Sequence, residues 1–322
     1  MNKASRTRLR ICTFKGVQNL AIYAAQEQGI FAAHDLNVEI AYTSGSKPQL
    51  ASLARGEYDL IQTAPDNVVN FDHNPAAFGI DASTAPRVVM VSGGSVGPLS
   101  IYAQSAIHTT GDLRGSVPGV DNPTSGFALV MRDLLARDGL ELERDYTFMI
   151  AGGTGTRLDA LIHGTVAATI LYAPFDAVAH EKGFSRLAVS TDLYPAYASL
   201  AVAGTQNWIE SHSNILILYL TAIRLALLWL YEAKNEAQVK ELMINSPALA
   251  LDAALAKRAY TAFVDPATGF GVEGKLDEAG LQQVIAIRAQ YDKDRHSYGK
   301  PTDYLDIRWY QQAAMALTNR KE

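Results

Sequence analysis

The chain has 322 residues, of which 48% are hydrophobic and 19% are charged, and its formal net charge is −5. This composition excludes a disordered or fibrous protein, and the length favours two domains or lobes. No Lys/Arg run follows the first few residues, so nothing indicates a nucleic-acid partner or an anionic membrane surface. The single cysteine, Cys12, excludes an internal disulfide and a cysteine-rich metal site.

Residues 1–10 are polar and basic, and they lack the apolar stretch of roughly 7–15 residues that a secretory signal needs. We therefore expect a periplasmic protein if a signal peptide was removed, and otherwise a cytoplasmic one. The apolar segment Ile215–Leu230 is interrupted by Thr221 and Arg224 and is shorter than the ~20 residues that span a bilayer. It is predicted to be a helix buried within a domain, in a protein that does not itself cross a membrane.

A segment of the first half recurs in the second half. Gly45 and Gly56 correspond to Gly153 and Gly164, so both ends of the segment give an offset of 108 residues. Each copy leads into a short apolar strand that ends at Ala-Pro. Two copies are too few for a solenoid, so the repeat predicts two similar α/β lobes.

Strands and helices alternate within each copy. The first copy predicts strands at Leu9–Phe14, Val38–Tyr42 and Asp59–Ile61, with helices at Gln18–Gln28 and Pro48–Arg55. The second predicts strands at Ser116–Val120, Tyr146–Ile150 and Ala167–Leu171, with a helix at Ser125–Asp138 and another after Gly153. This order is typical of parallel or mixed sheets flanked by helices.

Two extended segments are predicted to join the lobes. The first consists of strands Arg87–Val91 and Leu99–Ala103 around a Gly93-Gly94 turn, and the second is Tyr197–Ala203. We expect hinges near 93–98 and 201–204. Lobe 1 would comprise 8–96 and 204–322, including C-terminal helices that pack back on it, and lobe 2 would comprise 97–203, with the ligand cleft between them.

The loops that follow the predicted strands are rich in small polar residues. In open α/β sheets, ligands bind at the carboxyl ends of the strands, where the helices begin. The residues expected there are Thr13, Phe14, Lys15, Gln18, Asn19, Thr43, Ser44, Gly45, Pro65, Asp66, Asn122, Thr124, Ser125, Gly153, Thr154, Tyr172 and Pro174. Free N–H groups and hydroxyls suit an anionic or strongly hydrogen-bonding ligand, although the same residue types also cap helices and form turns. Phe14 and Tyr172 are the expected walls of a mostly apolar slot.

Several motifs resemble a known family. They are Tyr23–Phe31 followed by Leu36–Ile40, then Gln49–Asp59, then Gly111–Gly115. Over residues 9–263 the chain is similar to ABC-type substrate-binding proteins of the sulfonate/nitrate/taurine and thiamine-pyrimidine-precursor type. The resemblance implies a two-lobed type II periplasmic-binding fold, a small organic ligand, anionic or heteroaromatic, clamped between the lobes, and partnership with an ABC permease.

The fold that the resemblance implies also resembles that of some cytoplasmic enzymes, so some of these residues could be catalytic. Cys12 lies inside a strand and is expected to be buried. Gly93–Gly97 matches Gly-x-Ser-x-Gly, but a proline and a strand follow it, so it does not form a nucleophile elbow. Lys15 and Asp66 either pair with each other or hold opposite ends of a ligand, and His73 lies in a predicted polar loop.

No metal-binding spacing and no phosphate-binding loop is present, so we expect neither a metal nor a cofactor. The sequence favours a solute-binding protein without catalytic residues. The alternatives are a cytoplasmic enzyme acting on a small aromatic or heterocyclic acid, with desulfinase-, decarboxylase- or hydrolase-like chemistry, and a ligand-sensing module.

Overall fold

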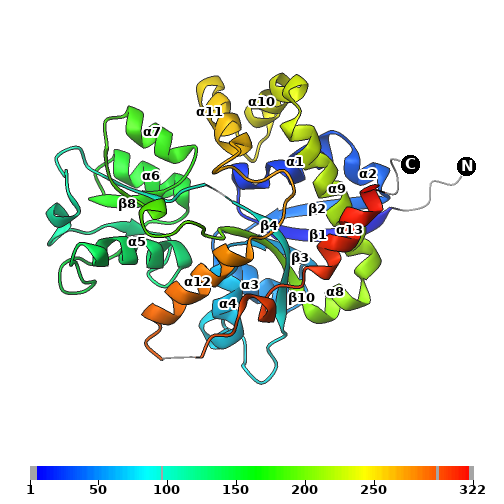
Figure 1. Cartoon of the computed structure of the whole chain (residues 1–322), viewed down its shortest axis with the longest axis horizontal. Coiled ribbons are helices and arrows are strands. Elements are labelled where there is room, and N and C mark those ends of the chain that lie inside the picture. The colour runs from blue at the N-terminus through cyan, green and yellow to red at the C-terminus, as the bar shows by residue number, and fades with distance from the viewer. Residues whose placement is uncertain (1–5, 96, 295–296, 319–322) are drawn as a thin grey trace, which may run out of the picture.

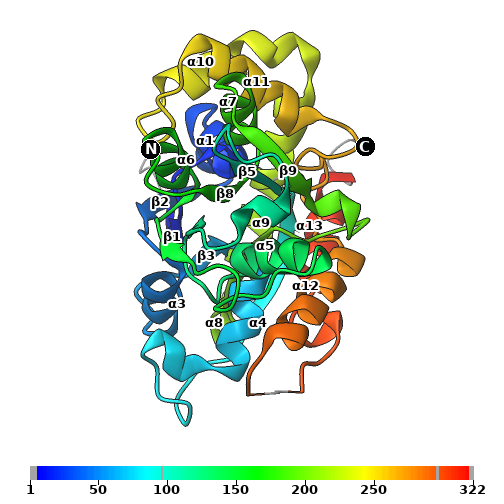
Figure 2. The ribbon, with the colours of Figure 1, turned by 90° about the vertical axis from the view of Figure 1, so that its left-hand side faces the viewer.

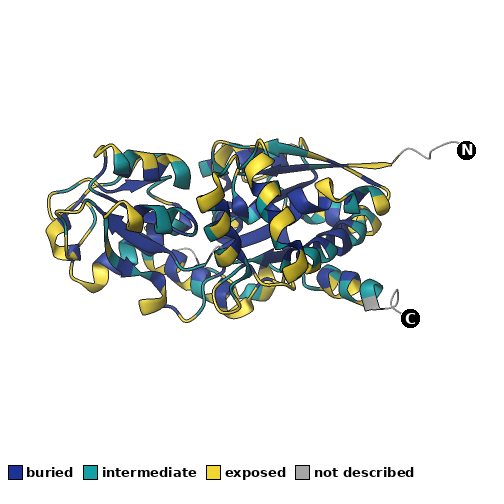
Figure 3. Ribbon diagram, turned by 90° about the horizontal axis from the view of Figure 1, so that it is seen from above, coloured by how far each residue is buried: buried dark blue, intermediate teal, exposed yellow. Residues whose placement is uncertain are grey.

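The computed structural model describes residues 6–95, 97–294 and 297–318, which form two lobes joined by extended segments (Figure 1). Each lobe contains one five-stranded sheet with helices packed around it. Buried strands lie inside each lobe, and the exposed residues lie outside (Figure 3). The prediction of two α/β lobes is therefore confirmed.

The two sheets share one strand order. The first runs β2-β1-β3-β10-β4 and contains β1 (Thr7–Thr13), β2 (Leu36–Tyr42), β3 (Leu60–Thr63), β4 (Val88–Gly94) and β10 (Leu200–Thr205). The second runs β7-β6-β8-β5-β9 and contains β5 (Ser100–Ala103), β6 (Gly119–Val120), β7 (Met149–Ile150), β8 (Ala168–Leu171) and β9 (Ser185–Val189). In each sheet the strand arriving from the other lobe, β10 or β5, is antiparallel to both of its neighbours. Both sheets are therefore mixed.

The repeated helices occupy equivalent places in the two lobes. Lobe 1 has α1 (Leu20–Glu27), α2 (Ile30–Ala33), α3 (Ser46–Ala54) and α4 (Pro65–His73), and lobe 2 has α5 (Gly126–Arg137), α6 (Thr154–Ile162) and α7 (Phe175–Glu181). Each parallel strand of the repeat runs toward a helix N-terminus, so these N-termini meet at the carboxyl edges of the sheets.

Six α-helices follow β10 in the part of the chain that the structure describes. They are α8 (Gln206–Ser211), α9 (Ser213–Tyr231), α10 (Glu236–Asn245), α11 (Ala253–Val264), α12 (Glu278–Tyr291) and α13 (Arg308–Thr318). By length and composition, α9 is the one described helix that could cross a membrane, and half of its most apolar window is buried. Its apolar side packs between α1 and α13 in the core of lobe 1, as the sequence predicts for a buried helix.

The C-terminal helices do more than cover lobe 1. Helix α12 packs against α4 of lobe 1 and α5 of lobe 2, and Arg258 of α11 forms an ion pair with Glu181 of α7 (Figure 2). The segment leading into α12 also packs on the end of β4 from which the first crossing starts, because a Cβ on Gly93 would be 2.5 Å from the Leu276 side chain. Lobe 2 is thus held by chain that follows the second crossing.

The connections between the lobes differ in detail from the prediction. The expected Gly93-Gly94 turn is wrong, because both residues belong to β4 and pair with β10. Residues 201–204 likewise lie within β10, so the linking chain precedes Leu200. Val96, where the predicted first segment of lobe 1 ends, lies outside the described residues.

Candidate functional site

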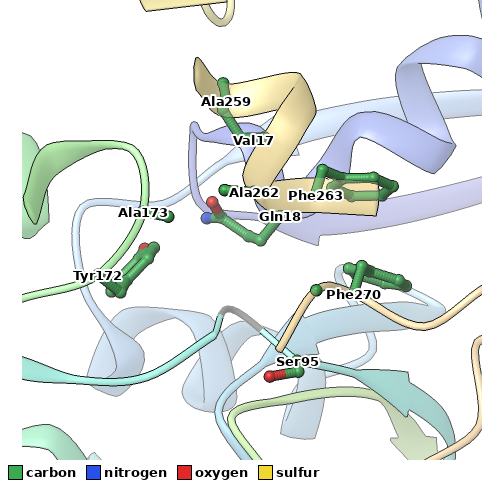
Figure 4. A pocket seen from close by; sticks show the side chains of 10 residues that line it. Val17, Gln18, Ser95, Tyr172, Ala173, Ala259, Ala262, Phe263 and Phe270 are labelled. Atoms are coloured by element: carbon green, nitrogen blue, oxygen red, sulfur yellow. The ribbon is translucent and has the colours of Figure 1, made fainter. Parts of the chain in front are cut away.

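A small cavity lies between the lobes where the carboxyl ends of their strands face each other (Figure 4). It is lined by Val17, Gln18, Ser95, Tyr172, Ala173, Ala259, Ala262, Phe263, Gly269 and Phe270. Its volume of about 30 Å³ is room for a water molecule rather than an organic ligand. A ligand that enters here must therefore displace the walls, which come from both lobes.

Aromatic rings form two of these walls. Tyr172, which is 9% exposed, comes from lobe 2 and is held edge-on by Phe127 and Phe175 at centroid distances of 5.8 and 6.2 Å. On the lobe 1 side the rings of Phe263 and Phe270 stack at 5.0 Å with an interplanar angle of 18° (Figure 4). These flat surfaces make the cavity predominantly apolar.

Polar groups reach the cavity at three points. The Gln18 side chain extends toward Ala173 and Tyr172 (Figure 4). Ser95 Oγ also lines the cavity and accepts a hydrogen bond of 2.9 Å from the Gly97 N–H. Burial raises the pKa of the Tyr172 hydroxyl, so this group stays neutral at physiological pH. All three side chains can donate or accept a hydrogen bond without carrying charge.

Several predicted residues of lobe 1 are occupied in bracing their own loops. Thr13 Oγ1 donates to Asn19 Oδ1 at 2.7 Å, and the Asn19 amide donates to the Phe14 carbonyl oxygen. Thr43 Oγ1 donates to the Gly45 carbonyl oxygen at 2.8 Å. Gln18 is the predicted lobe 1 residue that this structure brings to the cavity, whereas Phe14 does not line it.

The predicted residues of lobe 2 behave similarly. Ser125 caps α5 by accepting from the Ala128 N–H, and Asn122 Oδ1 accepts from the Thr124 hydroxyl at 2.9 Å. Thr154 Oγ1 accepts from Arg157 at 3.1 Å. Among these candidates Tyr172 alone lines the cavity.

The remaining candidates lie in the surrounding turns. Ser44 is exposed, Pro65 begins α4, Gly153 precedes α6, and Pro174 precedes α7 after a cis peptide bond.

Lys15 and Asp66 do not pair with each other, which was one of the two alternatives for these residues. The Lys15 ammonium lies 5.5 Å from the centroid of the Tyr42 ring, outside the cavity. Asp66 is instead bound by Arg288, with Nε–Oδ1 at 2.8 Å. A partner 222 residues away in the sequence leaves no local signal.

The candidates for catalysis are also held in structural contacts. His73 is not in a loop but ends α4, and its Nε2 lies 2.7 Å from the Tyr304 hydroxyl. Cys12 is buried in β1, as expected. Over the described part of the chain, no three His, Cys, Asp or Glu side chains are grouped so that they could hold a metal ion.

Three arginines approach the interface between the lobes, and none was a sequence candidate. Arg157 of α6 is 1% exposed, and it donates to the carbonyl oxygens of Gly152 at 2.9 Å and Ile170 at 3.1 Å. Arg258 pairs with Glu181, and Arg288 with Asp66.

The repeat offers a signal for Arg157. By the 108-residue offset, its counterpart in lobe 1 is Gln49, whose amide donates to the Gln62 carbonyl oxygen at 3.0 Å. Ile170 is likewise the counterpart of Gln62, so both side chains tie a helix to the same strand position. The position held by Gln49 in the first copy and by Arg157 in the second is therefore a buried polar position, which the alignment of the two copies can identify.

Two matching lobes with mixed sheets and a cavity between their carboxyl edges define the periplasmic-binding-protein fold. The model of the NMT1-like family matches residues 2–244, and the chain belongs to this family. No curated protein sequence matches the chain.

Solved structures confirm the fold. The nitrate-binding protein NrtA of Synechocystis PCC 6803 aligns with a TM-score of 0.79 at 12% identity, covering 97% of this chain and 89% of that one. A Bordetella bronchiseptica RB50 protein also gives 0.79, at 17% identity, with 99% and 100% covered. The alkanesulfonate-binding protein SsuA of Xanthomonas axonopodis pv. citri, bound to MOPS, gives 0.69 at 17% identity, with 94% and 99% covered.

Proposed function

We propose that the chain is a solute-binding protein whose two lobes close on one small organic molecule. The observation that carries the proposal is a cavity walled by Gln18 and Phe263 on one side and by Tyr172 on the other. A ligand that touches both walls is bound more tightly by the closed arrangement than by an open one, and this difference drives closure. The crossings from β4 to β5 and from β9 to β10 would act as hinges between lobe 1 and lobe 2. The predicted boundary at 203/204 moves to the residues before Leu200, because β10 (Leu200–Thr205) belongs to the lobe 1 sheet.

The relatives support a role in uptake. NrtA and SsuA are named as nitrate- and alkanesulfonate-binding proteins, and one further structure, from Staphylococcus aureus, is named as the ligand-binding component of an ABC-type import system. By analogy we propose delivery of the ligand to an ABC permease and a periplasmic location.

A thermal-shift screen tests the proposal. Small sulfonates, aromatic acids and amides, pyrimidines and amino-acid-like solutes would each be added to the full chain. A ligand present at 100 times its Kd stabilises the folded state by about 2.7 kcal/mol. We expect at least one compound that stabilises the protein and is recovered chemically unchanged, whereas recovery as a different compound would establish the enzyme alternative.

Cavity variants locate the site of any such compound. Tyr172→Ala and Phe263→Ala each remove one wall, so each should weaken binding at least tenfold. Phe148→Ala is the matched control, because this half-buried aromatic of lobe 2 packs on Tyr146, away from the cavity. Equal affinity in all three variants would place the site elsewhere.

A further inference from the structure

The cavity differs from a typical anion site in its charge. Among the described residues that line it, none has an ionisable side chain other than the neutral Tyr172. Of the three nearby arginines, two pair directly with a carboxylate: Arg258 with Glu181, and Arg288 with Asp66. Arg157 Nη1 lies 3.8 Å from Asp121 Oδ1, beyond hydrogen-bond distance, and its buried Nε has no hydrogen-bond partner among the described residues.

Of the three arginines, Arg288 is matched most completely. Arg288 binds both oxygens of Asp66, at 2.8 and 2.5 Å, and its Nη2 also donates to the Thr124 carbonyl oxygen of lobe 2 at 2.7 Å. Both side chains are buried, with 7% of Arg288 and 2% of Asp66 exposed. An anionic ligand could recruit this guanidinium only by leaving a buried carboxylate without its partner, which is strongly unfavourable.

Arg157 is committed in a different way. Its guanidinium donates to backbone oxygens and to Thr154, and its bond to the Ile170 carbonyl oxygen is the counterpart of the Gln49–Gln62 bond in lobe 1. Burial lowers the pKa of Arg157, and the nearby Asp121 opposes this shift. In lobe 1 the equivalent bond to the strand is donated by an uncharged amide, that of Gln49. Arg157→Gln can therefore keep the bond to Ile170 while it removes the positive charge.

The neutral features of the cavity point to a different ligand. A carboxylate or sulfonate moved into this site would lose its hydration without touching a cation, since none of the described lining residues is charged. An amide or hydroxyl, in contrast, can exchange hydrogen bonds with Gln18 and Ser95, which both donate and accept. A flat apolar body that displaces the walls would contact Tyr172 on one side and the Phe263–Phe270 stack on the other, since aromatic rings bind such surfaces well.

The apolar wall is supplied by chain beyond the region that the family model matches. The match to the family ends at residue 244, and the wall residues Ala259, Ala262, Phe263 and Phe270 all follow it. We infer that, within the proposed solute-binding function, this cavity selects an uncharged ligand with a flat apolar body and one hydrogen-bonding group, and discriminates against the carboxylate or sulfonate of the same shape.

Calorimetric titration with matched compounds tests this inference. The probes are benzamide, benzoate and benzenesulfonate, together with nicotinamide and nicotinate, each titrated at pH 7 into the full chain. We expect an amide to bind at least tenfold more tightly than the acid of the same ring. Gln18→Leu should remove most of that preference, and Arg157→Gln should leave amide binding within about threefold.

The outcomes separate the inference from the function on which it rests. Acids or sulfonates that bind as tightly as the amides, or the absence of binding by any amide, would overturn the inference. Loss of binding in Arg157→Gln with no loss in Gln18→Leu would also overturn it, because that result assigns recognition to the cation. In each case a sulfonate or other solute that binds and is recovered unchanged would leave the proposed function standing.

Discussion

Removing Arg288 should destabilise the protein more than any exposed charge change, because it would leave Asp66 buried without a partner. In Arg288→Met the apolar volume is largely kept, but the carboxylate, 2% exposed, loses both of its hydrogen bonds from the guanidinium. Breaking a buried pair from one side costs about 3–5 kcal/mol. With an unfolding entropy of about 2.1 cal/mol/K per residue, a chain of 322 residues should lose about 4–7 °C in Tm.

Calorimetry on three variants checks the size and the cause of this effect. Arg8→Met is the control, since Arg8 and Glu39 form an exposed pair with 65% and 46% of their side chains accessible. Such pairs contribute about 0–1 kcal/mol. Asp66→Asn combined with Arg288→Met removes the buried charge and should regain much of the loss. The reasoning is refuted if Arg288→Met costs no more than Arg8→Met, or if the double variant is no more stable than Arg288→Met.

Three further outcomes are expected. Burial raises the pKa of the Cys12 thiol from 9.0 to about 11. The unfolded chain therefore loses this proton at lower pH than the folded protein, and the free energy of unfolding should fall as pH rises from about 9 to 11. Iodoacetamide at pH 8 should label the thiol of the unfolded but not of the folded protein. Gly126→Ala places a Cβ 2.7 Å from the Asp66 side chain and should cost about 1–3 kcal/mol in denaturant titrations, whereas Gly153→Ala meets nothing within 4 Å and should be neutral. Asp133 of α5 accepts hydrogen bonds from Tyr194 and, from α12, those of Gln290 and Tyr291. Asp133→Asn weakens this acceptor and should expand the ligand-free protein in small-angle scattering. An unchanged radius of gyration would show that the contact between α5 and α12 does not hold the lobes together.

The fold could be predicted because its signals are local and occur twice. The Gly45–Gly56 segment and its copy identify equivalent helices, and the apolar strands after them predict equivalent sheets. The sequence does not predict strand β9, because only Ala188 of its residues is buried and the apolar pattern of this edge strand is weak.

The cavity was only partly predictable. Gln18 and Tyr172 follow repeated strands, so their position at the carboxyl edge can be predicted from the repeat. Phe263 and Phe270 come from a C-terminal region that has no second copy, and nothing in their neighbours indicates which lobe they face. Ser95 lies in the Gly93–Gly97 segment, whose Gly-x-Ser-x-Gly pattern predicts no nucleophile, yet it lines the cavity directly after β4.

The interleaved chain order has a consequence for how the protein folds. All five strands of the lobe 2 sheet lie in one continuous stretch, from Ser100 to Val189. The lobe 1 sheet stays incomplete until β10, synthesised after them, inserts between β3 and β4. Contacts between residues close in sequence form faster than contacts between distant ones. Lobe 2 should therefore fold first, and the lobe 1 sheet should form only after β10 has joined it. Hydrogen exchange during refolding should accordingly protect β5 and β8 before β3 and β4.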